Sequence, residues 1–450
     1  MSKRMPYTEM GNNTLTKLAL ISERARKEPK FKFTSIAHLL NEGFLKECYY
    51  SLGRDRAGGI DGVSWKEYGE RLDENLKDLV TRLKTKRYKP LPSRRVYIPK
   101  DEHLNRALGL PALEDKIVQK GVARILEAIY EQDFLNCSYG FRPNRSCHQA
   151  LDVVDKTIMR GPINYIIEAD IKGYFDNVSH EWMMKCLEVR INDPSFLLLI
   201  KRFLKAGYID AGRLVVTKRG TPQGGNLSPM LANIFLHYVL DLWFEKKIKP
   251  KAKGMCCLVR YADDFVCTVQ YHDDAKYIEQ AMRERFTKFN LELHPEKTRI
   301  INFGRKEREK ANRNEHQPNT FNFLGFTHYW GKSRRGNRTL CRKTSRKRFC
   351  RACKDLSTWL KEIRCTEQVK EWWPTLQAKL RGHYQYYGIS GNGRMITRYH
   401  HVTNRLVFKW LNRRSQKISF SWKRFTEYLK HYPLPKPRIV HRLYTLSSDS

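Results

Sequence analysis

Two adjacent aspartates, Asp263 and Asp264, are the residues of this chain whose types and spacing most clearly suggest chemistry. Short apolar runs flank them at 256–261 and 265–269, and both runs are rich in β-forming residues. The sequence therefore predicts strand, tight turn and strand, with both carboxylates at the tip of the hairpin. Neighbouring carboxylates repel each other and are costly to bury unless a cation compensates them. The pair predicts a divalent metal site rather than a structural turn.

A second copy of the Tyr-x-Asp-Asp pattern, at 271–274, provides an internal comparison. The helical pattern 275–282 follows it, so Asp273 or Asp274 most simply caps the N-terminus of a helix. The four-letter pattern is therefore weak by itself. The interpretation of the first copy rests on the strands predicted on both of its sides.

A third carboxylate, Asp170, lies in the apolar run 165–171, which predicts another strand. If this strand shares a sheet with the hairpin, Asp170 converges with Asp263 and Asp264. Three carboxylates that hold two Mg²⁺ ions about 4 Å apart suit the attack of a 3′-hydroxyl on a nucleoside triphosphate. Because the same geometry suits a nuclease, the metal ligands alone leave both reactions open.

The neighbouring segments predict the elements that would surround these groups. A strand at 96–100, a polar turn and the run 106–111 predict a β-hairpin with Lys100 and Arg106 near its tip. The glycine-rich loop 220–229 leads directly into an apolar helix, and its glycines permit close approach of the backbone to a ligand.

Other segments have a structural interpretation. The glycine-rich turn 56–64 precedes a helix at 65–83, with Ser64 as N-cap and Glu67 at the capping-box position. This turn lacks the Gly-Lys-Ser/Thr ending of a phosphate-binding loop.

The segments after this turn are less specific about function. Residues 113–130 predict an amphipathic helix, and the loop 137–146 contains two arginines. These arginines fit a solvated surface or phosphate contacts equally well.

Length and charge restrict the class of protein. The 450 residues suffice for two or three domains, and the net charge is +38. Residues 331–450 hold 29 Lys and Arg against 6 Asp and Glu, a net of +23. From 331 the pattern is helical with interleaved aromatics, which is typical of a basic helical bundle that binds a polyanion.

The sequence also indicates the cellular compartment of the protein and whether it associates with a membrane. No apolar run approaches the roughly 18 residues of a membrane span, and Met1 leads into no signal-peptide core. We therefore expect a cytoplasmic protein with nucleic acid, and no membrane, as its partner. The eleven cysteines are scattered and odd in number, which predicts reduced thiols used as small hydrophobic residues. The group formed by Cys341, Cys350, Cys353 and Cys365 lies outside the usual zinc spacings.

Three of these segments, taken in order, resemble the central motifs of reverse transcriptases, specifically the group II intron-encoded reverse transcriptase/maturase. They are Asp170-Ile-Lys-Gly-Tyr-Phe-Asp176, Gly220-Thr-Pro-Gln-Gly-Gly-Asn-Leu-Ser-Pro229 and Tyr261-Ala-Asp-Asp264. The likeness extends to 106–111, 137–143, 297–298 and 323–326, and so covers about residues 50 to 330. From 331 to about 430 it is looser and rests mainly on 380–387, which is similar to the maturase X domain that serves as thumb.

The resemblance implies an α+β right-hand polymerase with helical fingers, an antiparallel-sheet palm and an α-helical thumb. The expected order is a basic N-terminal extension at 1–50, fingers at 51–165, palm at 166–330, thumb or maturase X domain at 331–430 and a short basic C-terminal tail at 431–450. No His-Asn-His segment follows paired Cys-x-x-Cys motifs, so the endonuclease domain of longer members is expected to be missing.

The resemblance also implies roles for single residues. Asp170, Ile171, Asp263 and Asp264 would hold two Mg²⁺ ions, with Mn²⁺ as a substitute. Phe175 would lie under the sugar and exclude a 2′-hydroxyl. Gln223 and Gly224 would shape the dNTP pocket, Lys100 and Arg106 would grip the triphosphate, and Lys297 would protonate the leaving pyrophosphate. We expect RNA contacts from the basic cluster Arg342, Lys343, Arg346, Lys347 and Arg348.

The leading hypothesis is an RNA-directed DNA polymerase that extends a DNA primer on an RNA template with dNTPs. It would also bind a structured intron RNA and promote splicing and retrohoming into target DNA. One alternative is an RNA-binding splicing maturase with a non-essential polymerase site, against which the intact Asp170, Asp263, Asp264 and Gln223 argue. Another is a reverse transcriptase domesticated for phage defence or adaptive immunity.

Overall fold

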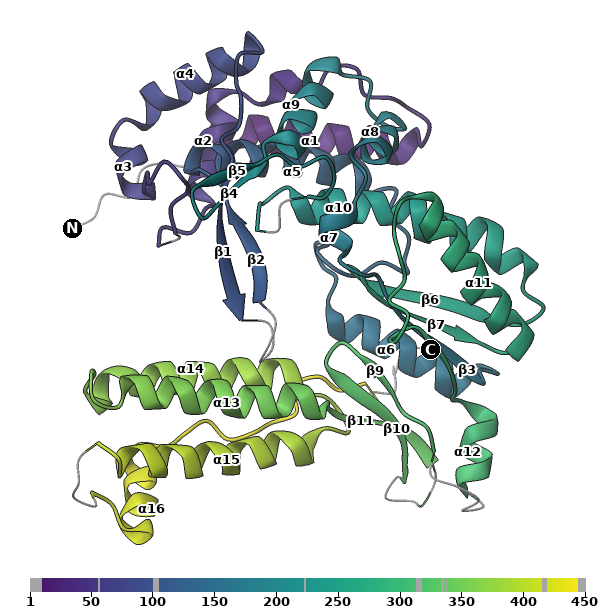
Figure 1. Cartoon of the computed structure of the whole chain (residues 1–450), viewed down its shortest axis with the longest axis vertical. Coiled ribbons are helices and arrows are strands. Elements are labelled where there is room, and N and C mark those ends of the chain that lie inside the picture. Colours follow the sequence, from purple (N-terminus) through teal and green to yellow (C-terminus); the bar gives the residue numbers. More distant parts are fainter. Residues whose placement is uncertain are drawn as a thin grey trace.

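The three-dimensional structure is a computed structural model. It describes residues 10–443 apart from 56, 100–104, 222–223, 313–317, 333–335, 337 and 415–418. Figure 1 shows a helical body at the top, a sheet covered by helices at the right and a helical bundle at the lower left. In the described residues no helix is long and apolar enough to cross a membrane.

A four-stranded sheet forms the centre of the right-hand body, in the order β6-β7-β3-β8 with antiparallel neighbours. Alternate residues of β7 point to opposite faces. Phe265 and Cys267 join a core with α10 and α11, whereas Val266 joins a second core with α6. Burial on both faces explains why the strands are continuous apolar runs in the sequence. The bounds are β3 (Tyr165–Asp170), β6 (Cys256–Tyr261), β7 (Asp264–Val269), β8 (Arg299–Asn302), α6 (Cys147–Arg160), α10 (Ser228–Leu236), α11 (His272–Lys288) and α12 (Arg305–Asn312).

The second Tyr-x-Asp-Asp copy opens a helix as predicted, but its aspartates do not cap that helix. Helix α11 begins at His272, and its N-cap residue, Tyr271, makes no side-chain cap bond. The Asp274 carboxylate instead accepts bonds from the backbone N–H groups of Lys253, at 3.0 Å, and Gly254, at 2.9 Å. The capping prediction is wrong because the loop before β6 approaches and uses the same acceptor.

The upper body contains the predicted amphipathic helix with the predicted bounds, since α5 runs from Leu113 to Tyr130. The helix predicted at 65–83 is two helices that meet at Arg71, and the capping box of Ser64 and Glu67 is confirmed. The helices of this body are α1 (Met10–Lys27), α2 (Glu42–Tyr50), α3 (Trp65–Glu70), α4 (Leu72–Lys84), α5 (Leu113–Tyr130), α8 (His180–Glu188) and α9 (Pro194–Lys205).

The predicted β-hairpin is β1 (Ser93–Pro99) with β2 (Asn105–Leu110), which extend a second sheet with β4 (Tyr208–Asp210) and β5 (Arg213–Val215). In Figure 1 the hairpin points from the upper body toward the helical bundle. Arg351 in that bundle donates a 2.8 Å hydrogen bond to the carbonyl of Pro99. The tip of the hairpin therefore contacts the bundle.

The helical prediction from residue 331 is wrong at its start. The strands β9, β10 and β11 form a three-stranded sheet in the order β11-β10-β9, and the expected boundary between 330 and 331 divides β10. Alternate burial of Phe326, His328 and Trp330 shows the period of two that favours a strand. This part contains β9 (Phe321–Phe323), β10 (Phe326–Lys332), β11 (Arg338–Thr344), α13 (Arg346–Ile363), α14 (Val369–Tyr387), α15 (Gly393–Leu411) and α16 (Trp422–His431).

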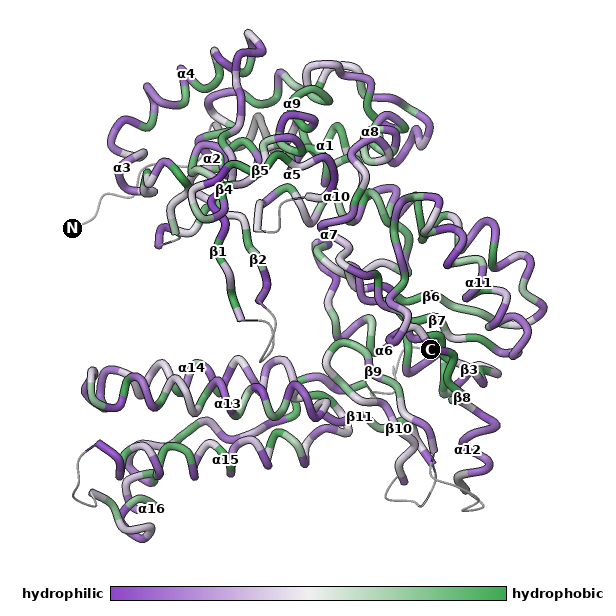
Figure 2. Tube along the Cα trace, in the orientation of Figure 1, coloured by the Kyte–Doolittle hydropathy of each residue, from purple (hydrophilic) through white to green (hydrophobic). Residues whose placement is uncertain are grey.

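Most aromatics of the bundle are packing residues, as expected, although Trp422 is 51% exposed. Trp372, Trp373, Tyr384 and Tyr399 lie in one apolar core. In Figure 2 the bundle helices alternate between hydrophilic and hydrophobic stretches, which is the pattern of helices with one buried face. All eleven cysteines of the chain are free thiols, as expected, but Cys350 and Cys365 are exposed, so these two are not buried hydrophobic residues.

Candidate active site

The strand register brings together the aspartates predicted from the sequence. Asp170 lies opposite Asp264 in the β3–β7 pairing, and Tyr261 lies opposite Asp264 in the β6–β7 pairing. Ala262 and Asp263 therefore form the tip of the hairpin, and Ala262 has a left-handed backbone with a φ of 58°. Two strands of one sheet thus place Asp170 beside the Asp263–Asp264 turn.

The electrostatics of the three carboxylates favour a cation. Part of Asp264 is exposed, but its carboxyl group is buried. This burial, together with the negative charges of Asp263 and Asp170, raises the pKa of Asp264 to about 6. Arg348 and Lys297 act in the opposite direction on this pKa. The hairpin therefore concentrates more negative charge than its basic neighbours neutralise.

Lys297 reaches the same site from the turn before β8. Its Nζ lies 2.6 Å from Oδ2 of Asp170, and the backbone N–H of His294 donates a 2.8 Å bond to the Asp170 carbonyl. Ile171, the residue after Asp170, forms an antiparallel β-bridge with Leu293, so these two chain segments lie side by side. Among the residues that the structure describes, no three acidic, histidine or cysteine side chains are arranged to hold a metal ion.

Three of the five predicted nucleotide-binding residues lie in described segments: Phe175, Gly224 and Arg106. Phe175 is half-buried in the short helix α7 (Tyr174–Asn177), and its carbonyl accepts a 2.7 Å bond from the Thr221 N–H. A Cβ atom on Gly224 would lie 2.6 Å from the carbonyl oxygen of Gly109, so this backbone passes directly against β2. Arg106 is exposed on β2 opposite Ile98. Lys100 and Gln223 lie outside the described residues.

A cavity of about 400 Å³ lies between the hairpin sheet and the glycine-rich loop. Its walls carry both charges, since Arg95 and Arg219 line it together with Asp176. Gly109 and Thr221 also line it, so the cavity joins the predicted hairpin to the predicted glycine-rich loop.

The basic cluster predicted to bind RNA is divided by the structure. Arg342 is fully buried in β11, and its Nη2 lies 2.6 Å from Oδ1 of Asp155 on α6. Assigning Arg342 to an RNA-contacting surface is therefore wrong, because its side chain points inward on the same face as Leu340 and Thr344. The other four members of the cluster are exposed: Lys343, Arg346, Lys347 and Arg348.

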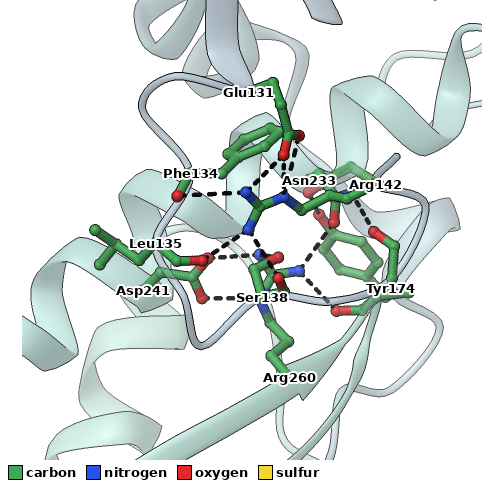
Figure 3. A network of polar contacts seen from close by, with 12 residues as sticks. Glu131, Phe134, Leu135, Ser138, Arg142, Tyr174, Asn233, Asp241 and Arg260 are labelled. Carbon is green, nitrogen blue, oxygen red and sulfur yellow. Dashed lines mark hydrogen bonds and ion pairs between the residues drawn. The ribbon is translucent and has the colours of Figure 1, made fainter. Parts of the chain in front are cut away.

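Sequence reasoning missed a buried polar network behind the hairpin, drawn in Figure 3. Arg260 on β6 and Asp241 are both fully buried and form an ion pair, with Arg260 Nε 2.7 Å from Asp241 Oδ1. Two features of the sequence could have indicated this ion pair: Arg260 lies inside an apolar strand run, and Asp241 lies inside an apolar helical run. Charged residues at such positions need partners when they are buried.

The same network answers the open question about the loop 137–146 for Arg142 only; Arg145 is half-buried and donates a 2.8 Å bond to Oδ1 of Asn136. Arg142 is buried, forms an ion pair with Glu131 at 2.7 Å and donates to the carbonyls of Leu135 and Ser138. Arg142 is therefore neither a solvated residue nor a group exposed to phosphates. It fixes the shape of the loop.

Comparisons with known proteins agree with the motifs. The family described as reverse transcriptase (RNA-dependent DNA polymerase) matches residues 98–328. Protein YkfC of Escherichia coli (strain K12) is 37% identical over 277 residues, which cover 54% of this chain and 71% of that protein. Group II intron-encoded protein LtrA of Lactococcus lactis subsp. cremoris is 32% identical over 348 residues, which cover 64% of this chain and 57% of that protein.

Two further likenesses are more distant. Nuclear intron maturase 1 of Arabidopsis thaliana is 30% identical over 116 residues, covering 25% of this chain and 16% of that protein. A telomerase structure from Candida albicans aligns with a TM-score of 0.42 at 14% identity, covering 82% of this chain and 66% of that one. This last likeness is too distant to support an inference about function.

Proposed function

Since the chain belongs to the reverse transcriptase family, with a fold of the fingers, palm and thumb type, we propose that it is an RNA-directed DNA polymerase. It would extend a DNA primer on an RNA template by two-metal nucleotidyl transfer. The observation that supports this most directly is the register that sets Asp170 opposite Asp264, beside the turn that bears Asp263. The upper body would be the fingers, the β6-β7-β3-β8 sheet the palm, and β11 together with the α13–α16 bundle the thumb.

The chemical type of these donors, though not their present arrangement, suits the metal that this chemistry needs. Carboxylate oxygens are the ligands that Mg²⁺ prefers. Asp170, Asp263 and Asp264 would hold the ions, together with the backbone carbonyl of Ile171, and Mn²⁺ would substitute. When bound, such ions lower the pKa of an attacking hydroxyl and neutralise the charge on the leaving group.

Residues of the chain would do the remaining work. The Lys297 ammonium group, held 2.6 Å from Asp170, would donate a proton to the leaving pyrophosphate. Lys100 and Arg106 would bind the triphosphate from the hairpin, while Gln223 and Gly224 would shape the floor of the dNTP pocket. The Phe175 ring would lie under the sugar and exclude a 2′-hydroxyl.

The raised pKa of Asp264 predicts an acid limit to metal binding. Below about pH 6 the carboxyl is protonated, and binding a cation must displace that proton. The apparent affinity for Mg²⁺ should therefore fall by up to about tenfold per pH unit below 6, and this group should have no effect well above 6. Calorimetric titration with Mg²⁺ between pH 5 and 8 measures this directly. A constant affinity across pH 6 would contradict the assignment of Asp264 as a ligand.

Sugar selection provides a second prediction. If Phe175 packs under the deoxyribose, Phe175→Ala should raise rNTP incorporation relative to dNTP incorporation, by up to about 100-fold, because it removes a steric clash. Single-nucleotide extension with each substrate gives the ratio. Phe175→Tyr keeps the ring and should keep the discrimination. If the Ala variant has the wild-type ratio, Phe175 is a packing residue instead.

We extend the proposal to a structured RNA partner. Relatives are named as group II intron-encoded proteins and an intron maturase, and the exposed thumb residues Lys343, Arg346 and Lys347 supply positive charge. The protein would bind its intron RNA, assist splicing and copy the RNA into target DNA. The binding-only maturase and the domesticated phage-defence enzyme are the alternatives, and the first is tested below by separating the two activities.

A further inference from the structure

The side chain of Arg260 makes a set of buried contacts that ends at the tip of the Asp263–Asp264 hairpin. Its Nε donates to Asp241 at 2.7 Å, and its Nη2 donates to the Ser138 hydroxyl at 2.7 Å. Its Nη1 donates to Oδ1 of Asn233 at 3.0 Å and to the carbonyl of Ala262 at 2.9 Å. One guanidinium group therefore joins two chain segments, the loop that contains Ser138 and the helical run that contains Asn233 and Asp241, to the peptide just before the two aspartates. Figure 3 shows Arg260 with these three partners.

The backbone of the same segment holds the hairpin from a second side. The Arg260 N–H donates to the Cys137 carbonyl at 2.8 Å, and the Tyr139 N–H donates to the Arg260 carbonyl at 2.9 Å. The next residue, Gly140, lies so close that a Cβ atom on it would be 2.3 Å from the backbone N of Ala262. Asn233 fixes Gly140 in turn, since its Nδ2 donates to the Gly140 carbonyl at 2.7 Å.

These contacts act on a strained peptide. Ala262 has a φ of 58°, a left-handed conformation that non-glycine residues adopt only when their surroundings impose it. The carbonyl that Arg260 binds belongs to this residue, and the next two side chains are the carboxylates. A rotation of the Ala262–Asp263 peptide would therefore redirect the Asp263 side chain and disturb the start of β7, where Asp264 lies opposite Asp170.

Stability alone is a weak reason for such a group. Replacing a buried ion pair with apolar residues of similar volume is often neutral or stabilising, because both charges lose their hydration. Planar guanidinium geometry does offer several donors in fixed directions, which an apolar side chain or a lysine ammonium does not. We propose that Arg260, supported by Asp241, Ser138 and Asn233, is a positioning residue that sets the direction of Asp263 and Asp264 for cation binding and catalysis. This inference rests on the proposed polymerase function.

The first test replaces Arg260 with Lys, which keeps the charge opposite Asp241 but reaches fewer acceptors at once. A misplacement of about 1 Å in an active site costs about 100-fold in rate, so we expect kcat for single-nucleotide extension to fall by about that factor. The KM for dNTP and the affinity for primer-template should stay within about threefold of wild type, since neither ligand contacts Arg260. Binding of Mn²⁺, followed by electron paramagnetic resonance without any substrate, should weaken by about tenfold.

The second test, Gly140→Ala, disturbs the hairpin without changing any charge. The added Cβ atom must displace the Ala262 backbone, so this variant should show the same reduction of kcat and the same weakening of Mn²⁺ binding. The matched control is Gly43→Ala on α2, where an added Cβ meets only the side-chain oxygen of Asn41, at an ordinary contact distance of 3.5 Å. That variant should have wild-type kcat and Mn²⁺ affinity.

The outcomes separate this inference from the function beneath it. If wild-type protein extends no primer, the polymerase proposal fails, and Mn²⁺ binding by the variants still tests the positioning role. Thermal unfolding shows whether each variant is folded, and if Arg260→Lys is not, Gly140→Ala decides. A folded Gly140→Ala protein with wild-type kcat and Mn²⁺ affinity would overturn the positioning role. Equal losses in KM, primer-template affinity and kcat would also overturn it, because they would indicate a general structural defect.

Discussion

Asp263→Ala and Asp170→Ala are each expected to abolish primer extension on an RNA template in Mg²⁺. Both carboxylates lie at the meeting point of β3 and the β6–β7 hairpin, and each would supply oxygen ligands to the ions. The expected loss of activity is about 10⁴-fold or more, as for removal of a central catalytic group. Single-nucleotide extension at saturating Mg²⁺ measures it. Affinity for RNA should stay close to wild type, because phosphate contacts dominate that binding.

The chain supplies its own matched control. Asp273 belongs to the second Tyr-x-Asp-Asp copy but lies exposed in the first turn of α11, so Asp273→Ala should extend primers normally. Near wild-type extension by the Asp263 or Asp170 variant would show that the metal assignment is wrong. Loss of both extension and RNA affinity would point to misfolding.

The second large effect is expected from the exposed thumb cations. Changing Lys343, Arg346 and Lys347 together to Gln should make the binding of intron RNA less sensitive to salt. In a plot of the logarithm of the binding constant against the logarithm of the salt concentration, the slope should become shallower by about 0.7 to 0.9 for each phosphate that the variant no longer neutralises. RNA-assisted splicing should fall with it. Extension on a short template should suffer less, since a short duplex offers fewer phosphates. Filter binding at several salt concentrations, splicing and extension assays provide the three measurements.

The control for this experiment removes the same charge elsewhere. Lys276 and Lys288 are exposed on α11 and Lys251 is exposed beside that helix, and the change of all three to Gln should leave splicing near wild type. Arg342 is omitted because its ion pair with Asp155 joins β11 to α6, and removing it would destabilise the fold. If the thumb variant is equally impaired in splicing and extension, these cations serve the polymerase alone. If neither activity falls, the maturase part of the proposal lacks support.

Elements with local signals could be predicted from the amino-acid sequence without a structure. Continuous apolar runs placed the β6–β7 hairpin around Asp263 and Asp264, and helical periodicity gave the bounds of α5. The capping box at Ser64 was equally recognisable, since both of its partners lie within four residues. Such signals depend on side chains that are close in sequence, so no knowledge of distant contacts was needed.

The burial of charged groups and the identity of their partners emerged only from the folded chain. Arg342 belongs to the same basic run as Lys343, yet a strand places it inward against Asp155, 187 positions away in the sequence. Arg260 reaches Ser138 across 122 positions, and Asp274 is bound by a loop rather than by its own helix. A basic or acidic residue carries no mark of burial in its local pattern, because only a distant partner compensates the loss of hydration. The sequence therefore supplied the candidate catalytic aspartates, and packing determined which cations are exposed and which one holds the hairpin.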